Sequence, residues 1–357
     1  MKCSHSNNRG KRLTMQVTQA LWQCPNCHNV LTPSDSGLAC TNGHSFDRAK
    51  QGYVNLLLAN KKHSRDPGDD QSMIDARRAF LQAGHYKFLI ENIASLIQEV
   101  QGRAERQAPT SELTEAEDLP VTLLDIGCGE AYYLAQLQQQ LQQGLPSPLQ
   151  LLGIDISKFA VKRAAPYLKQ AQFAVASSFD IPVLDNSIQC ALSVFAPFDS
   201  KEVARILKKT QSCFIRVTPG PRHLYQIKQA LYEQANLHEP ASIPEGFELL
   251  TEKQLHRTIS LNGAGDLANL LAMTPLNWHG RAESKTELLA QAQIDLELDF
   301  CVQVFTAVEL VEDASDEAVE QLPNEPIAES EAVSENEVEN EAENEAENEA
   351  KNALKGE

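Results

Sequence analysis

Four residues near the N-terminus have the types and the spacing of a metal site. Two residues separate Cys24 from Cys27, twelve separate Cys27 from Cys40, and three separate Cys40 from His44. Three thiolates and one imidazole form a closed tetrahedral set of Zn²⁺ ligands, so the ion would be structural rather than catalytic. Zinc would also supply folding energy to a segment of roughly 40 residues, which is short for a core of its own. The alternative, unrelated thiols beside a surface histidine, fits this spacing less well.

A second group of residues indicates a cofactor site. Gly127 and Gly129 lie in the segment Leu-Leu-Asp-Ile-Gly-Cys-Gly-Glu at 123–130, where glycine allows a sharp turn and a close approach to a ligand. Asp125 and Glu130 would repel the phosphate that such loops hold in dinucleotide sites. An acidic loop instead suits a cationic ligand such as the amino group and sulfonium of S-adenosylmethionine. Asp155, which follows 28 residues after Gly127, could accept both ribose hydroxyls of an adenosine. The glycine loop and Asp155 together favour the cofactor site of a class I methyltransferase over a turn with only a structural role.

The elements that must position these residues alternate from residue 121 onward. Short apolar runs separated by segments of helical length are typical of βαβ units and a parallel sheet. An apolar run at 296–308 is expected to be an antiparallel edge strand that closes this sheet. The predicted fold class is therefore α/β, a Rossmann-like class I methyltransferase domain preceded by a small zinc-binding domain. Strands are predicted at 121–126, 149–155, 171–176, 188–195 and 211–218, and helices at 72–98, 130–143, 157–168, 199–208, 221–236, 263–271 and 283–292.

Composition and charge divide the chain into four parts. Residues 1–22 are interpreted as a flexible basic arm, 23–60 as the zinc-binding domain, and 61–310 as the methyltransferase domain with a linker at 101–119. Residues 312–357 hold 17 acidic residues and two lysines, a net charge of −15, whereas the other 311 residues hold 32 acids and 29 bases. The acidic tail, 311–357, has few large apolar groups to bury, so we expect it to be disordered. The net charge of −18 describes this tail and does not exclude a basic surface on the body.

The chain has no features of a membrane or secreted protein. It contains no run of about 18 apolar residues, which argues against a membrane span. The first 22 residues lack the apolar region of a secretory signal. Eight cysteines in 357 residues are too few for a disulfide scaffold, so a reducing compartment, the cytoplasm, is expected. Cys128, in the glycine loop, is interpreted as a small buried residue rather than as a nucleophile.

Further motifs extend this pattern, and together they resemble one family. With the zinc spacing and the glycine loop they closely resemble the bacterial 23S ribosomal RNA (guanine-N1)-methyltransferases of the RlmA type, over residues 22–305. The sequence departs from the family where the third glycine of the loop is Ala131, in the long linker and in the acidic tail. The motifs are Gly-Tyr-Val-Asn-Leu-Leu at 52–57, Ser-Arg-Asp-Pro-Gly-Asp at 64–69, Ala-Arg-Arg-Ala-Phe-Leu-Gln-Ala-Gly-His-Tyr at 76–86, Thr-Pro-Gly-Pro-Arg-His-Leu at 218–224 and Met-Thr-Pro-Leu-Asn-Trp at 273–278.

The resemblance implies a substrate, cofactors and site residues. It implies S-adenosylmethionine, a structural zinc ion, a homodimer, and a hairpin of 23S ribosomal RNA as substrate, with no DNA or membrane partner. It adds Tyr86, Tyr133, Leu134 and His223 to the cofactor contacts. Without the resemblance, Tyr86 would be a packing residue and His223 the start of a helix. The Arg-Asp-Pro-Gly-Asp string is more similar to a Gram-negative branch, which modifies one guanine, than to a sister branch that modifies a nearby guanine and is linked to macrolide resistance.

The implied chemistry needs a base and an accessible nucleobase. Guanine N1 carries a proton at neutral pH, and this proton must leave or the charge that develops at O6 must be stabilised. Candidate bases are Asp66, Asp69 and His223, although the two aspartates could equally cap the helix that starts near residue 71. N1 lies on the Watson–Crick edge, so the base must be unpaired or flipped. Tyr53 and Trp278 are candidate stacking partners, with core packing as the alternative.

Several basic residues follow the zinc segment and could contact RNA phosphates. They could equally form an ordinary exposed helix face. Two other functions remain open: a methyltransferase for a small molecule, and a non-catalytic zinc RNA-binding protein with a methyltransferase-like fold. The zinc segment and the basic residues argue against the first, and the intact acidic glycine loop argues against the second. The basic residues are Lys61, Lys62, Arg65, Arg77 and Arg78.

Overall fold

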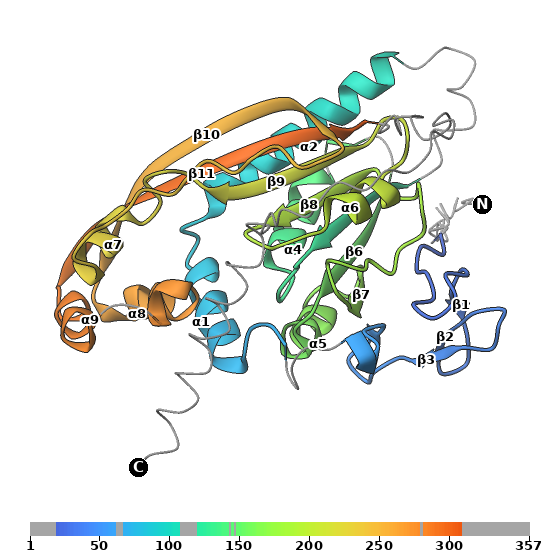
Figure 1. Cartoon of the computed structure of the whole chain (residues 1–357), viewed down its shortest axis with the longest axis horizontal. Helices are drawn as coiled ribbons and strands as arrows, with labels where there is room; N and C mark the ends of the chain where they lie inside the picture. Colours follow the sequence, from blue (N-terminus) through green and yellow to red (C-terminus); the bar gives the residue numbers. More distant parts are fainter. Residues whose placement is uncertain are drawn as a thin grey trace, which may run out of the picture. The chain divides into compact units, whose positions relative to one another are not determined.

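The computed structural model describes residues 19–61, 67–107, 120–142, 144–145, 148–278 and 281–308. Most of the predicted arm, the linker from residue 108 and the acidic tail lie outside the described residues. Within them, an eight-stranded sheet has the strand order β10-β11-β9-β8-β5-β6-β7-β4, and a separate three-stranded sheet has the order β1-β2-β3 (Figure 1).

The strands and helices have the following bounds. The strands are β1 Thr32–Pro33, β2 Gly37–Ala39, β3 Ser45–Asp47, β4 Val54–Asn55, β5 Val121–Ile126, β6 Leu149–Asp155, β7 Gln172–Val175, β8 Cys190–Val194, β9 Cys213–Pro219, β10 Phe247–Asn262 and β11 Gln293–Ala307. The helices are α1 Gln71–Gln82, α2 Lys87–Gln107, α4 Tyr132–Leu141, α5 Lys158–Tyr167, α6 Ser200–Ile206, α7 Tyr225–Leu231, α8 Ala264–Ala272 and α9 Ala282–Leu289, with 3₁₀ turns η1 Ala59–Lys61 and η2 Pro275–Trp278.

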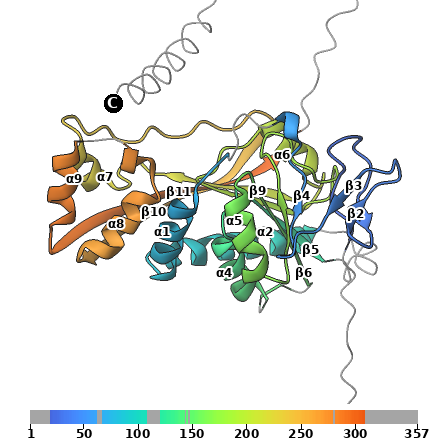
Figure 2. The ribbon, with the colours of Figure 1, turned by 90° about the horizontal axis from the view of Figure 1, so that it is seen from below.

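The centre of the large sheet is parallel and buried on both faces. Strands β4 to β9 pair in parallel. Strands β5 to β9 were predicted from their apolar runs, whereas the two-residue strand β4 was not predicted. Because side chains alternate along a strand, Leu123 joins the core under α2 and α4, whereas its neighbour Leu124 joins the core that includes α6 and residues of the zinc segment. Figure 2 shows α2 and α4 on one side of the sheet and α6 on the other. The strand order reverses between β5 and β8, where ligands bind in folds of this kind.

The antiparallel edge of the sheet differs from the prediction. β11 is antiparallel as expected, but it lies between β9 and β10, so it is not the edge strand. The edge is β10, which the sequence analysis missed. Exposed polar residues such as Glu248 and Glu252 interrupt it on either side of a bulge, so it lacks the apolar run on which the other strand predictions depended. Charged side chains are common on edge strands, because they discourage pairing with another chain.

The predicted helix over 72–98 is two helices. Gly84 has a φ of 85° after the end of α1, and its N–H donates to the carbonyl of Leu81 at 3.0 Å. A glycine in the left-handed conformation is a common helix terminator. The break places Tyr86 at the beginning of α2, which runs to Gln107. The first seven residues of the predicted linker are therefore helical.

The zinc segment and the large sheet share a core. Leu21 and Trp22 are 3% exposed, and the indole N–H of Trp22 donates to the side chain of Gln172 at 2.8 Å. The end of the predicted flexible arm, residues 19–22, is therefore packed. Strand β4 follows the three small strands and pairs with β7, so the chain enters the large sheet before residue 60. Among the described residues, no helix is long and apolar enough to cross a membrane.

Candidate cofactor and metal sites

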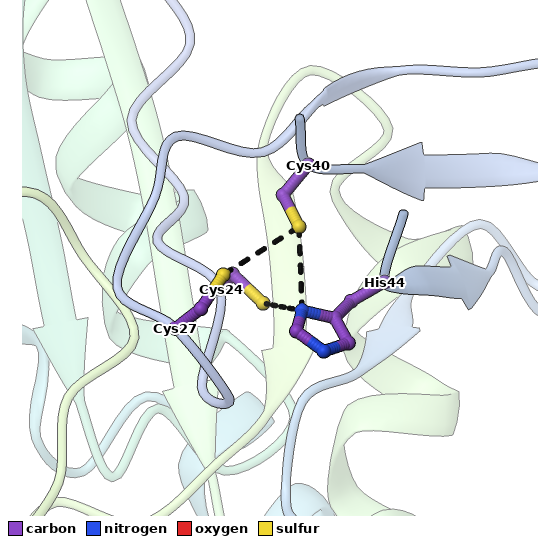
Figure 3. Close-up of side chains that lie close together, drawn as sticks. All are labelled: Cys24, Cys27, Cys40 and His44. Carbon is purple, nitrogen blue, oxygen red and sulfur yellow. Dashed lines mark hydrogen bonds between the residues drawn. The ribbon is translucent and has the colours of Figure 1, made fainter. Parts of the chain in front are cut away.

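The structure brings the four predicted zinc ligands together. Cys24 and Cys27 lie on one turn, while Cys40 and His44 lie on the connection between β2 and β3 (Figure 3). Their ligand atoms are all within 4.8 Å of one another, and His44 Nδ1 is 3.5 Å from the sulfur atoms of both Cys24 and Cys40. Such a set of three sulfurs and one nitrogen suits tetrahedral Zn²⁺ and has no gap for a substrate.

Local hydrogen bonds favour the ligand form of one cysteine. Burial raises the pKa of the Cys40 thiol, but the backbone N–H groups of Asn42 and His44 outweigh it, and the pKa is lowered to about 6. The N–H of Gly43 donates to the carbonyl of Cys40 at 3.0 Å, and Gly43 has a φ of 83°. The connection between β2 and β3 is therefore a tight turn, which places its two ligands, Cys40 and His44, close together.

The glycine loop forms the turn from β5 into α4. Gly127 and Gly129 have φ angles of 72° and 55°, and the N–H groups of Gly127 and Cys128 both donate to Ile154 at 2.9 Å. A Cβ atom at Gly127 would lie 2.3 Å from that of Ala196, whereas a Cβ atom at Gly129 would meet nothing within 4 Å. The first glycine therefore permits close packing, and the second borders open space for a ligand. Cys128 is 4% exposed, which agrees with its interpretation as a small buried residue.

Asp155 is held at the end of β6, one strand away from the loop. Its two carboxylate oxygens accept hydrogen bonds from the N–H groups of Gly129 at 2.8 Å and Ser157 at 2.7 Å. Burial raises its pKa, although these two N–H groups oppose the shift. Ser157 also donates its hydroxyl to the carbonyl of Asp69 at 2.7 Å, so Asp69, the last residue of the 64–69 motif, lies close to this carboxylate. Each oxygen of Asp155 has a second lone pair that a hydroxyl could use.

Two further acids of the loop are buried. Asp125 is 1% exposed, and one of its oxygens is a buried atom without a partner among the described residues. Burial, and then the nearby Asp155, raises the pKa of Asp125 to about 8. Burial likewise raises the pKa of Glu130 to about 7, although Arg78 lies 3.3 Å away and opposes it. Unpaired buried acids are costly, so this loop suits a ligand that brings positive charge. The site thus fits S-adenosylmethionine.

The four residues that the resemblance implies as cofactor contacts differ in their exposure. Tyr133 is half-buried in the first turn of α4, whereas Leu134 is fully buried, so only its backbone N–H could reach a ligand. Tyr86 is 2% exposed, and its ring packs 4.9 Å from Phe300. His223 is 8% exposed, with its ring 6.4 Å from that of Tyr86. Direct contact of these four residues with the cofactor stays a prediction.

The structure describes two of the three candidate bases. Asp66 lies outside the described residues. Asp69 forms an ion pair with Arg77, and Asp70, not Asp66 or Asp69, caps α1 by accepting from Met73 at 2.9 Å. Burial lowers the pKa of His223 to about 3, so the ring is neutral, and its Nδ1 accepts from the N–H of Asp299 at 3.3 Å. The ring proton then resides on Nε2, which gives His223 a hydrogen-bond donor there, and a role of His223 as a base stays a prediction.

Most of the predicted basic and stacking residues have other partners. Lys61 pairs with Asp180 at 2.5 Å, and Arg77 and Arg78 pair with acids of the cofactor region, so these three are not a simple phosphate-binding cluster. Lys62 and Arg65 lie outside the described residues. Tyr53 is 5% exposed and belongs to the core, which removes it as a stacking partner. The side chain of Trp278 lies outside the described part.

Phe195 is an exposed aromatic residue that the sequence analysis did not single out. It follows β8 directly and is 42% exposed, and its ring stacks on His223 at a centroid distance of 6.0 Å and an interplanar angle of 24°. The available signal was its position immediately after a strand adjacent to β5. Ala196, the next residue, is the one that packs against Gly127.

Comparisons with known proteins agree with this arrangement. A family model described as "RlmA, N-terminal" matches residues 22–65, and one described as "Methyltransferase domain" matches residues 123–214. The 23S rRNA (guanine(748)-N(1))-methyltransferase of Streptomyces fradiae is 34% identical over 277 residues, which cover 75% of this chain and 90% of that protein. A relative from Micromonospora griseorubida is 30% identical over 72% of this chain and 86% of its own length. One from Bacillus subtilis (strain 168) is 28% identical over 79% and 96%.

The fold and the two sites define a methyltransferase with an N-terminal zinc ribbon and a Rossmann-like catalytic domain. Identity at this level over three quarters of the chain adds the family: the protein belongs to the 23S rRNA (guanine-N1)-methyltransferases. Its cofactors are accordingly S-adenosylmethionine, which supplies an electrophilic methyl group on a sulfonium, and a structural zinc ion.

Proposed function

We propose that this protein methylates N1 of a guanine in a hairpin of 23S ribosomal RNA, as a homodimer in the cytoplasm. The observation that carries the proposal is the intact acidic loop, with open space beside Gly129, in a chain whose relative is named for this reaction. A small-molecule substrate would not require the zinc ribbon, and a non-catalytic protein would not require the buried acids of the loop.

The protein's own residues have three tasks toward the cofactor. Asp155 is fixed by two backbone N–H groups and can accept ribose hydroxyls with its remaining lone pairs. Asp125 has an unpartnered buried oxygen and can neutralise the amino group or the sulfonium. The unpaired N–H groups in the first turn of α4, among them those of Tyr133 and Leu134, can hold the carboxylate of the methionine part. Methyl transfer is an in-line displacement, so catalysis consists mainly of such positioning.

A basic groove beside the zinc ribbon supports an RNA substrate. A cavity of about 910 Å³ lies between the ribbon and α5, and its lining includes Arg48, Lys50 and Lys169. A second cavity, of about 650 Å³, lies on the other side of Pro166 and is lined in part by Lys162 and Arg163. Several cations around two neighbouring cavities suit the repeated phosphates of a nucleic acid better than a single small anion, although Arg163 also pairs with Asp75.

The test is direct. Purified protein is incubated with labelled S-adenosylmethionine and with large-subunit RNA from a strain that lacks this modification, and the digested RNA is analysed by mass spectrometry. We expect one N1-methylguanine per RNA molecule with the wild-type chain and little with Asp155→Ala. Label in a small molecule but not in RNA would instead support the small-molecule alternative. Binding of RNA without any methyl transfer would support the non-catalytic alternative.

A further inference from the structure

Phe195 lies at the point of the sheet where a substrate must meet the cofactor. It is the first residue after β8, and Gly127 is the first residue after β5, the parallel neighbour of β8. The strand order reverses between these two strands, and ligands in such sheets bind outside the carboxyl ends of the strands at that place. Contact between Ala196 and Gly127 fixes the turn that carries Phe195 against the cofactor loop.

The backbone of this turn is strained yet well supported. Phe195 has a φ of 56°, a conformation that bulky side chains rarely adopt. Among the described phenylalanine and tyrosine residues that are exposed, it is the only one with a positive φ. Its N–H donates to the carbonyl of Val217 at 3.1 Å, and the hydroxyl of Ser193 donates to the carbonyl of Ala196 at 2.9 Å. Strain that is maintained by surrounding contacts is found mostly at functional sites.

One face of the Phe195 ring is already occupied. The neutral ring of His223 stacks below it, and Phe300 lies 5.7 Å away at an angle of 51°. The ring nevertheless remains 42% exposed, so part of its apolar surface is available to a ligand. The rings of His223 and Phe300 hold one side of the Phe195 ring in place. The exposed part of the Phe195 ring is therefore a fixed platform on which a base could stack.

We infer that Phe195 is the stacking partner of the target guanine, an inference that rests on the proposed function. A guanine taken out of its stem loses its neighbouring bases, and an aromatic ring can replace one of them. The platform would hold the base beside the glycine loop, with its Watson–Crick edge free for reaction at N1. His223 acts through Phe195, as the support that fixes the orientation of the ring.

The test compares Phe195→Leu, Phe195→Tyr and the wild-type chain. Leucine keeps an apolar side chain but removes the π-face, whereas tyrosine keeps it. We expect kcat/KM for RNA methylation to fall roughly 5-fold to 150-fold in Phe195→Leu, the range measured for the loss of one base–aromatic stack, and to stay near wild type in Phe195→Tyr. Affinity for S-adenosylhomocysteine, measured by calorimetry, should be the same in all three. Leu250→Ala is the control for loss of an exposed apolar side chain, because Leu250 is 47% exposed and lies in β10, outside both cavities.

A fluorescent base separates stacking from a structural role. The RNA hairpin carries 2-aminopurine at the guanine that mass spectrometry shows to be methylated. Its emission should be quenched on binding to wild type, Phe195→Tyr and Leu250→Ala, and should be bright with Phe195→Leu. Equal emission and equal kcat/KM in wild type and Phe195→Leu would overturn the inference and leave the proposed function intact. Absence of N1-methylguanine with the wild-type chain would instead refute the proposed function.

Discussion

At the scale of single residues, Asp155 links the cofactor loop to the next strand. Its carboxylate accepts N–H groups from Gly129, in the loop, and from Ser157, before α5. The same group is therefore available both to shape the loop and to bind a ribose. Sequence spacing was sufficient to select it, because the end of the second parallel strand lies beside the loop in every fold of this type.

Replacement of Asp155 should weaken cofactor binding. Asp155→Ala leaves the ribose hydroxyls without acceptors, so the dissociation constant for S-adenosylhomocysteine should rise by the equivalent of about 1–3 kcal/mol. Asp155→Asn retains one acceptor oxygen and should have an intermediate affinity. Isothermal titration calorimetry on the folded variants gives both values. If Asp155→Ala bound as tightly as wild type, the cofactor site would have to lie elsewhere.

The buried Asp125 should make stability depend on pH. Its pKa is about 8 in the folded protein and near 3.8 in the unfolded chain, so the folded state holds more protons between these values. Its contribution to the free energy of unfolding is full below pH 4 and is lost as the pH rises through 8. We therefore expect the cofactor-free protein to melt at a lower temperature at pH 8.5 than at pH 6.5. Asp125→Asn should flatten this slope, and an equally steep slope in the variant would contradict the assignment.

At the scale of elements, strands whose own residues are continuously apolar were predicted from the sequence. Elements whose position depends on contacts with distant segments were missed. The parallel strands β5 to β9 are apolar on both faces, so each was evident from a short run of residues, whereas the two-residue strand β4 was not predicted. β10 was missed because half of its side chains face solvent and its pairing depends on β11, which comes about 30 residues later. The break between α1 and α2 was missed because Gly84 was taken as a helix interior residue. The tautomer of His223 could not be predicted from sequence, since it depends on the backbone of Asp299.

The zinc ribbon should contain one metal ion per chain. Cys40→Ser removes one of four ligands, so the variant should lose zinc and unfold at a lower temperature, because metal binding supplies part of the ribbon's folding energy. Elemental analysis and thermal unfolding measure the two effects. Cys301→Ser is a suitable control, since Cys301 is also a buried thiol but lies in β11. Full zinc occupancy in a Cys24→Ser, Cys27→Ser double variant would refute the ligand assignment.

At the scale of the whole molecule, the two ends of the chain carry opposite charge. Residues 312–357 have a net charge of −15, whereas residues 1–18 contain four basic residues and no acidic ones. The acidic end should repel RNA at low ionic strength, and salt should screen this repulsion. The basic end should attract phosphates under the same conditions. The net charge of the complete chain is thus a poor guide to its affinity for RNA.

Removal of either end should therefore have opposite effects on RNA binding. A chain that ends near Asp313 should fold normally, bind the cofactor unchanged, and bind the RNA hairpin as well as wild type or slightly better. The gain should shrink at high salt. A chain that lacks residues 1–18 should bind RNA more weakly, again mostly at low salt. Affinity at two salt concentrations measures both. Loss of RNA methylation on tail removal, with cofactor binding intact, would show that the tail takes part in the reaction.

The short strand β4 has a consequence for how the two cofactors influence each other. It continues the ribbon chain into the large sheet, where it pairs with β7, and the residue after β7, Ala176, donates to the carbonyl of Asp155 at 3.1 Å. Zinc and S-adenosylmethionine are thus proposed to bind at opposite ends of a path that runs through the β4–β7 pair to Asp155. Thermodynamic linkage then requires reciprocity: if zinc tightens binding of the adenosine, the adenosine must tighten binding of zinc by the same factor. A chelator titration with and without S-adenosylhomocysteine should show that the nucleoside delays loss of the metal, and identical titration curves would mean that the two ends are independent.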